Sequence, residues 1–186
     1  MKVYQINVSL NEIQPNIWRR FLVKDTTTLP ALHKILQTVM GWTNSHLHHF
    51  VVDREIYSEP DEYNELEYID YRKTRIRDVM DSVNDAMTYE YDFSDGWEHS
   101  LILEKVIDSD PDVKYPVCLA AERNCPPEDC GGAHGFMEML DILNNPNHEE
   151  YESWKTWVGD EYDSERFDLS IVNRLLRQRN YGLPSW

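Results

Sequence analysis

Residues 89–107 read Tyr-Glu-Tyr-Asp-Phe-Ser-Asp-Gly-Trp-Glu-His-Ser-Leu-Ile-Leu-Glu-Lys-Val-Ile. Apolar and polar residues alternate before Asp95-Gly96, a dipeptide typical of a two-residue hairpin loop. The pattern predicts an antiparallel hairpin whose return strand runs from Trp97 to about residue 107. A two-residue loop would place Asp92 directly opposite His99 on one face of the hairpin, whereas a three-residue loop would shift the register and separate the two side chains.

Alternation in the first half of the chain predicts further strands. Strand-like segments cover residues 3–10, 16–23 and 47–53, and the first two join near Pro15. The acidic, tyrosine-rich stretch 55–71 has no periodicity and is predicted to be a long surface loop.

Helical periodicity predicts the remaining elements. The clearest helix is capped by Thr27 or Thr28, carries Pro30 in its first turn and ends at Gly41. Because helices and strands interleave, we expect an α+β fold with a mixed, mostly antiparallel sheet and packed helices. We expect one domain over residues 1–186, with a helical C-terminal region from about residue 147 to 186. The other predicted helices cover residues 75–82, 136–143, 151–157 and 169–176.

Composition limits the classes of function. The chain has 186 residues, of which 41% are hydrophobic, and carries a net charge of −16. The segment 53–168 is strongly acidic and would repel phosphate backbones, so nucleic-acid binding is disfavoured. Three cysteines, no signal-peptide pattern and no membrane-length apolar run predict a cytoplasmic protein without a membrane partner. The oligomeric state does not follow from these features.

The densest group of reactive residues is Cys125-Pro-Pro-Glu-Asp-Cys130-Gly-Gly-Ala-His134. Cys125, Cys130 and His134 have spacings that zinc sites tolerate, and Cys118 could supply a fourth ligand. The alternative is that the thiols are simply buried. Glu128 and Asp129 fit a role at the start of the following helix, where carboxylates complement its dipole, or a role in binding.

Two further pairs suggest metal or acid–base chemistry. His46 and His48 lie two residues apart, so on a strand they share a face and could bind a metal together; a polar strand edge is the simpler explanation. An Asp92–His99 pair could orient an imidazole as a general base, and these two residues are the catalytic candidates. A structural cross-strand pair is the alternative, since the sequence shows no neighbouring nucleophile.

Aromatic and basic residues form the last candidate set. Arg19 and Arg20 point to opposite faces of their predicted strand, so one of them approaches the apolar side and needs a carboxylate partner. Trp18, Trp42 and Trp97 could line a binding groove or belong to the core.

Several blocks of the sequence match one known family. The blocks are Ile17-Trp18-Arg19-Arg20, Thr28-Leu29, Leu32-His33, Met40-Gly41-Trp42, His46-Leu47-His48 with Phe50, Tyr91-Asp92-Phe93 with Asp95, Trp97 and His99, Cys125-Pro-Pro-Glu-Asp129 with Gly131, Gly132 and Gly135, and Asp163 with Phe167-Asp168. On these residues the chain resembles the plasmid pRi ORF-3-like family over nearly its whole length. It departs from the family at Pro15-Asn16, Ser94 and Phe136, and the position of Cys130 varies there.

The resemblance implies a compact α+β domain and no defined activity. Some relatives carry recombination-related labels, but this chain shows no resolvase-like serine motif. The leading hypothesis is a non-enzymatic binding or interaction domain, for a protein or small-molecule partner, with a surface formed by the histidine, aspartate and cysteine candidates. The first alternative is a metal-assisted hydrolase in which some of these residues hold one ion, with zinc as the possible cofactor. The second is a nucleic-acid-binding or recombination-associated accessory protein. It would need a basic face built from Arg19, Arg20 and the C-terminal Arg174, Arg177 and Arg179.

Overall fold

The computed structural model describes residues 1–60 and 67–184. Within them, eight strands form one sheet in the order β5-β4-β3-β6-β7-β1-β2-β8, and only β4 and β5 pair in parallel. The predicted α+β fold with a mixed, mostly antiparallel sheet is therefore confirmed. The strands are β1 Lys2–Leu10, β2 Trp18–Lys24, β3 His48–Val52, β4 Glu55–Ser58, β5 Ile69–Asp70, β6 Ala86–Tyr91, β7 Trp97–Asp108 and β8 Val117–Glu122.

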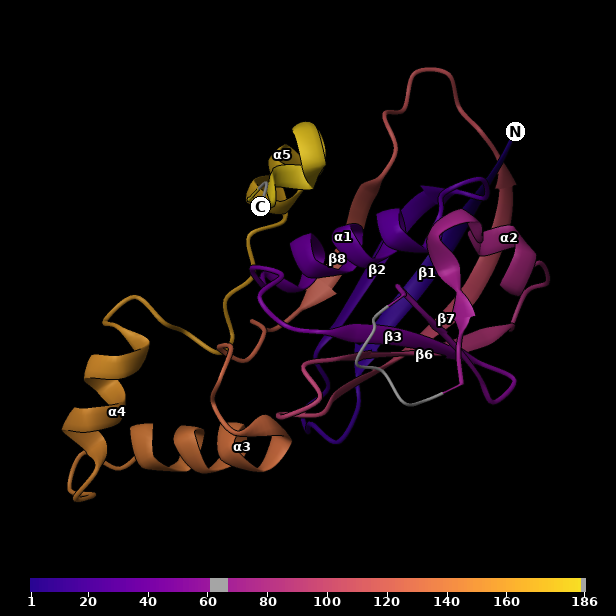
Figure 1. Cartoon of the computed structure of the whole chain (residues 1–186). Coiled ribbons are helices and arrows are strands. Elements are labelled where there is room, and N and C mark those ends of the chain that lie inside the picture. The colour runs from indigo at the N-terminus through magenta and orange to yellow at the C-terminus, as the bar shows by residue number, and fades with distance from the viewer. Residues whose placement is uncertain (61–66, 185–186) are drawn as a thin grey trace.

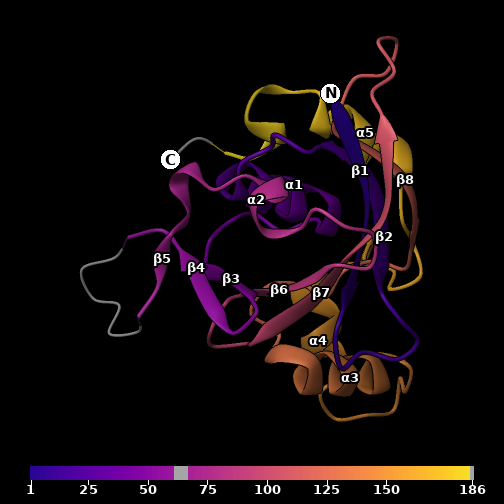
Figure 2. The same ribbon diagram turned by 90° about the vertical axis from the view of Figure 1, so that its right-hand side faces the viewer.

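The sheet curves around one long helix, α1, as Figure 2 shows. Two other helices, α3 and α4, lie together at the β6–β7 hairpin end, and α5 packs beside β8 (Figure 1). No helix among the described residues has the length and apolarity needed to cross a bilayer. The helices are α1 Leu29–Met40, α2 Ile76–Val79, α3 Gly132–Leu143, α4 Tyr151–Val158 and α5 Leu169–Leu176, with 3-10 turns η1 Tyr71–Lys73 and η2 Arg179–Gly182.

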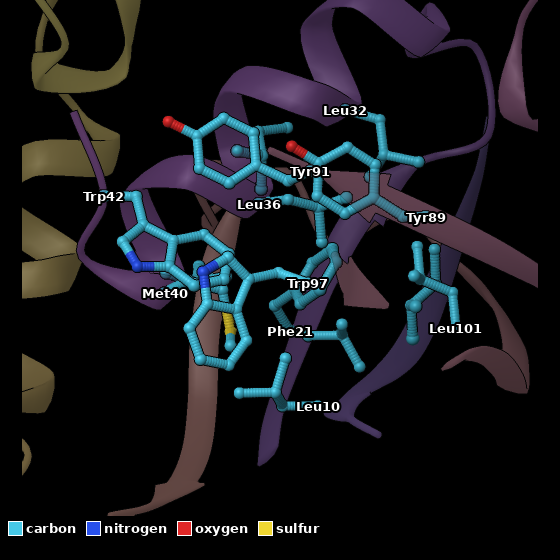
Figure 3. Packing of buried hydrophobic residues seen from close by; sticks show 14 of the residues in the cluster. Leu10, Phe21, Leu32, Leu36, Met40, Trp42, Tyr89, Tyr91, Trp97 and Leu101 are labelled. Carbon is cyan, nitrogen blue, oxygen red and sulfur yellow. The ribbon is translucent and has the colours of Figure 1, made fainter. Parts of the chain in front are cut away.

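The central helix follows its sequence signals. Thr28 caps α1 by accepting a hydrogen bond from the backbone N–H of Ala31, and Gly41 ends the helix with a left-handed φ of 100°. Its apolar side packs against the inward residues of β1, β2, β6 and β7 in one buried cluster, part of which appears in Figure 3. Three polar residues of α1, His33, Gln37 and Thr38, are also buried, and His33 and Gln37 face the region described below.

The hairpin forms, but its predicted register is wrong. Its loop spans residues 92–96, so Tyr89 and not Asp92 lies opposite His99, and Tyr91 lies opposite Trp97. This register buries Tyr89, Tyr91 and Trp97 on the core face, which the two-residue loop would not have allowed. Asp92 opens the loop by accepting hydrogen bonds from the backbone N–H groups of Ser94 and Asp95.

Two other expectations need correction. The stretch 55–71, predicted as a surface loop, contains β4 and β5 at its two ends, while residues 61–66 lie outside the described part of the chain. The edge strand β8 was not predicted. Its sequence shows no regular alternation of apolar and polar residues. In the structure it pairs with β2 through an irregular register, and Leu119 is exposed.

Candidate functional site

An open pocket of about 1000 Å³ lies where α1, the segment before β3, the end of β4 and the loop after β6 meet. It combines apolar walls with hydroxyl, amide, imidazole and carboxylate groups. The size and the mixed lining are typical of a small-molecule site. The pocket is lined by Pro30, His33, Lys34, Asn44, Ser45, His46, Leu47, His48, Ser58, Glu59, Pro60, Tyr71, Asp92, Phe93 and Ser94.

Hydrogen bonds fix the orientation of His33 in the pocket wall. The backbone N–H of Asn44 donates to Gln37 Oε1, so the Gln37 amide nitrogen donates to the Tyr89 hydroxyl at 3.0 Å. The Tyr89 O–H then donates to His33 Nδ1 at 2.8 Å, and His33 Nε2–H donates to Asn44 Oδ1. Each donor has one acceptor, so the imidazole is held as its neutral Nε2–H tautomer.

A second imidazole lies flat on the first. The rings of His33 and His48 are parallel with centroids 3.4 Å apart, and His48 Nε2 is 2.8 Å from the Tyr71 hydroxyl. Burial lowers the pKa of His33 to about 4, and burial together with the neighbouring His33 lowers the pKa of His48 well below its usual value. Both rings are therefore uncharged near neutral pH, and they add a flat, neutral, hydrogen-bonded surface to the wall instead of positive charge.

At the other end of the pocket, His46 approaches two carboxylates. Its Nε2 lies 3.2 Å from Asp129 Oδ1 and 3.6 Å from Asp92 Oδ2, and the three donor atoms all lie within 4.8 Å of one another. Asp92 is only 3% exposed, whereas Asp129 is 71% exposed. Residues from three separate segments thus converge on one point at the pocket edge.

The loop that carries Asp129 is tied to this point by its neighbours. The Glu128 carboxylate accepts hydrogen bonds from the Tyr91 hydroxyl and from Thr43, and Trp42 Nε1–H donates to the Pro126 carbonyl at 3.0 Å. A side chain at Gly132 would overlap the Asp95 backbone carbonyl, so glycine permits the close approach of this loop to the hairpin. Glu128 thus holds the loop in place.

The cysteine residues do not join this convergence. Cys118, Cys125 and Cys130 are all buried as free thiols, while His134 is exposed on α3. Burial raises the pKa of Cys118 to about 11 and of Cys130 to about 12, and it raises that of Cys125 further. Among the described residues, a group of three ligand atoms close enough to share an ion forms only at His46, Asp92 and Asp129. The predicted Cys125–Cys130–His134 zinc set is therefore not assembled.

The predicted Asp92–His99 dyad is not assembled either. His99 is fully buried, its Nδ1 is 3.1 Å from the Tyr89 carbonyl, and its ring packs edge-on against Trp42. Burial lowers the pKa of His99 to about 4. Trp42 and Trp97 belong to the same buried aromatic cluster (Figure 3). These two side chains are therefore part of the core, which is the second alternative that the sequence left open for them.

The two adjacent arginines are both occupied by structural contacts. Arg19 is fully buried and donates to the backbone carbonyls of Val39, Trp18 and Glu122. The expected carboxylate partner belongs instead to Arg20, which forms a two-point ion pair with Glu104 and lies over the Trp18 ring. Arg19 is therefore withdrawn from the surface, and the charge of Arg20 is paired with Glu104.

Sequence reasoning missed most of the pocket wall. The lining residues His33, Asn44 and Tyr71, and the buried Tyr89 that is hydrogen-bonded to His33, were not predicted as site residues. One signal was available: His33 and Gln37 are polar residues four apart beside the apolar stripe of α1, a position where buried polar groups need partners.

Known proteins resemble this chain over most of its length. A family model described as "Plasmid pRiA4b ORF-3-like protein" matches residues 2–171. "Uncharacterized protein y4hQ" from Sinorhizobium fredii (strain NBRC 101917 / NGR234) is 37% identical over 174 residues, covering 92% of this chain and 89% of the relative. The crystal structure of "Protein of Unknown Function MM3350" from Methanosarcina mazei Go1 is similar with a TM-score of 0.84 and 35% sequence identity, covering 91% of this chain and 96% of that chain.

Proposed function

We propose that this chain, which belongs to the plasmid pRiA4b ORF-3-like family, is a non-enzymatic binding domain whose ligand is a small polar molecule held in the histidine pocket. The observation that carries the proposal is the uncharged, hydrogen-bonded wall of a pocket of about 1000 Å³. Small-molecule sites have this order of volume and combine apolar walls with a few fixed polar groups.

The state of the histidines favours binding over acid–base catalysis. A general base works best when its pKa is close to the operating pH, and His33, with a pKa near 4, is too weakly basic for that task. The Tyr71 hydroxyl also stays protonated, because burial raises its pKa above the usual value. Groups with a constant protonation state suit recognition, since their hydrogen-bond pattern does not change with small shifts of pH.

The proposal is tested by NMR titration of the isotope-labelled full chain. Amino acids, dipeptides, nucleosides and monosaccharides are added separately at millimolar concentrations. We expect at least one of these classes to shift the backbone amides of Ser45, His46 and Ser94 in a saturable way. Shifts that are scattered over the chain, or no saturable shift with any class, would contradict a small-molecule pocket.

A pocket-filling variant supplies the control. Ser94 is exposed at the pocket wall, so Ser94→Trp should fold and occupy ligand space. Ser153→Trp adds the same bulk at an exposed serine of α4, away from the pocket. Binding should weaken at least tenfold in Ser94→Trp and stay within twofold of wild type in Ser153→Trp. Equal binding in both variants would place the ligand elsewhere.

Metal-assisted hydrolysis is the second candidate, and one observation favours it. The cluster His46, Asp92 and Asp129 supplies three donor atoms within 4.8 Å of one another beside the pocket. Its test is the cleavage of 4-nitrophenyl acetate and 4-nitrophenyl phosphate with added Zn²⁺ or Mn²⁺. Turnover that is lost in Asp129→Asn would support the hydrolase hypothesis. Turnover equal to that of the metal solution alone would contradict it.

A further inference from the structure

We infer that His46, Asp92 and Asp129 form a binding site for one divalent first-row cation, such as Zn²⁺ or Mn²⁺. This inference goes beyond the proposed small-molecule binding, which needs no metal. It also replaces the cysteine-based metal set predicted from the sequence with a set that contains one imidazole and two carboxylates.

The spacing of the donor atoms fits a shared ion. Ligands that each lie about 2.1 Å from a metal, at angles between tetrahedral and octahedral values, are roughly 3.0–3.4 Å apart. The His46 Nε2 to Asp129 Oδ1 distance is 3.2 Å, and the Nε2 to Asp92 Oδ2 distance is 3.6 Å. The two carboxylate oxygens lie within 4.8 Å of each other, and the Asp129 side chain is 71% exposed, which leaves it room to adjust toward a shared ion.

The nitrogen at the centre of the cluster lacks a hydrogen-bond partner. His46 Nε2 is buried, and although both carboxylates lie within ion-pair distance, neither has the geometry of a hydrogen bond to it. Buried polar atoms normally find a partner, and one that does not is a sign of an absent ion or water. A metal ion between the three side chains would satisfy this nitrogen.

The buried carboxylate also lacks a full counter-charge. Asp92 is 3% exposed, and among the described residues the only basic side chain within ion-pair distance of it is His46. Its Oδ1 accepts two backbone hydrogen bonds within the hairpin loop, which leaves Oδ2 directed toward His46. Burying a carboxylate is costly unless it is paired with a charge or coordinates a metal.

The ligand types limit which metal ion the site would prefer. One imidazole and two carboxylates suit first-row divalent metals, whereas Ca²⁺ prefers six to eight oxygens and Mg²⁺ prefers oxygen ligands. Two carboxylates balance the charge of a divalent ion. Three protein ligands leave coordination positions open toward the pocket, as in metal sites that bind exogenous ligands.

Calorimetric titration tests the inference on the untagged full chain, after chelator treatment and removal of the chelator. We expect ZnCl₂ or MnCl₂ to bind with a stoichiometry near one. Asp129→Asn and His46→Gln should each weaken the affinity at least tenfold. Asp129 is exposed and its φ of 61° is one that asparagine tolerates, so Asp129→Asn should fold as wild type, which circular dichroism verifies.

Two controls separate this site from other metal binding. Asp141→Asn removes an exposed carboxylate of α3 outside the cluster and should leave the affinity within twofold. Co²⁺-loaded protein should show no thiolate charge-transfer band. A folded chain that takes up neither ion at millimolar concentration, unchanged affinity in Asp129→Asn, or a thiolate band would each overturn the inference. The NMR titration needs no metal, so either proposal can fail without the other.

Discussion

The thiols of the 125–130 loop and the imidazole of His46 lie close to the same hairpin but are used differently. Cys125 and Cys130 are buried among apolar neighbours, and burial keeps them protonated by raising their pKa values. The buried Nε2 of His46 lies instead at the edge of an open pocket and lacks a hydrogen-bond partner. The difference teaches that an incomplete set of hydrogen-bond partners beside an open pocket is a better criterion for a candidate site than a high density of reactive residues along the chain.

Three buried histidines, His33, His48 and His99, should make the stability of the fold sensitive to acid. Burial lowers the pKa of His33 and of His99 to about 4, and that of His48 well below its usual value. Between pH 6.5 and 4 the unfolded chain therefore binds more protons at these positions than the folded chain does. The free energy of unfolding should fall as the pH falls through this window, by roughly 2 kcal/mol at pH 5 for each of His33 and His99, and His48 should act in the same direction.

Urea denaturation at pH 7, 6 and 5 measures this loss. His33→Gln should reduce the slope of the free energy of unfolding against pH, because up to one fewer proton is taken up on unfolding. This change in slope is expected whatever the stability of the variant at pH 7. The carboxylates with lowered pKa values, such as Glu104 and Asp168, lose their contribution only at lower pH. A stability that stays constant from pH 7 to 5, or an unchanged slope in His33→Gln, would contradict the buried neutral state.

The adjacent arginines of β2 also differ in burial: Arg19 is buried, whereas Arg20 is partly exposed. Arg19→Met should lower the free energy of unfolding by roughly 2–4 kcal/mol, because three backbone carbonyls lose their hydrogen-bond donor; removal of a buried charge partly offsets this loss. Arg20→Met should cost less than about 1 kcal/mol, because the Glu104 pair is partly solvent-exposed. Urea denaturation of the two variants checks this, and equal losses would refute the assignment of Arg19 to the core.

Much of the fold could be predicted because its signals are local. Neighbouring residues alone predict the alternation in β1, β2 and β7 and the two ends of α1, at Thr28 and Gly41. The register of the hairpin could not be read in this way. It depends on the burial of Tyr91 against Trp42 and on the loop closed by Asp92, which compete with the Asp95-Gly96 signal.

The site was harder to predict than the fold, because its members come from distant segments. His46 and Asp92 were candidates in separate sets, and Asp129 was assigned a binding or helix-start role. Their meeting depends on the contact between the 125–132 loop and the hairpin, which Gly132 permits and Glu128 secures. The density of reactive residues at 125–134 instead favoured a cysteine metal site, since sequence spacing does not reveal that the thiols are buried.

A nearly unchanged metal affinity is expected when the thiols are removed, and it tests whether they contribute to the candidate site. Cys130→Ala removes one buried sulfur, which should lower the free energy of unfolding by about 1–2 kcal/mol through lost packing. Because Cys130 contributes no donor atom to the His46 cluster, affinity for Zn²⁺ or Mn²⁺ should stay within twofold of wild type. Cys125→Ala is the matched variant, and it should behave in the same way. A tenfold loss of affinity in either folded variant would connect the loop thiols to the site and reverse the contrast between the two groups.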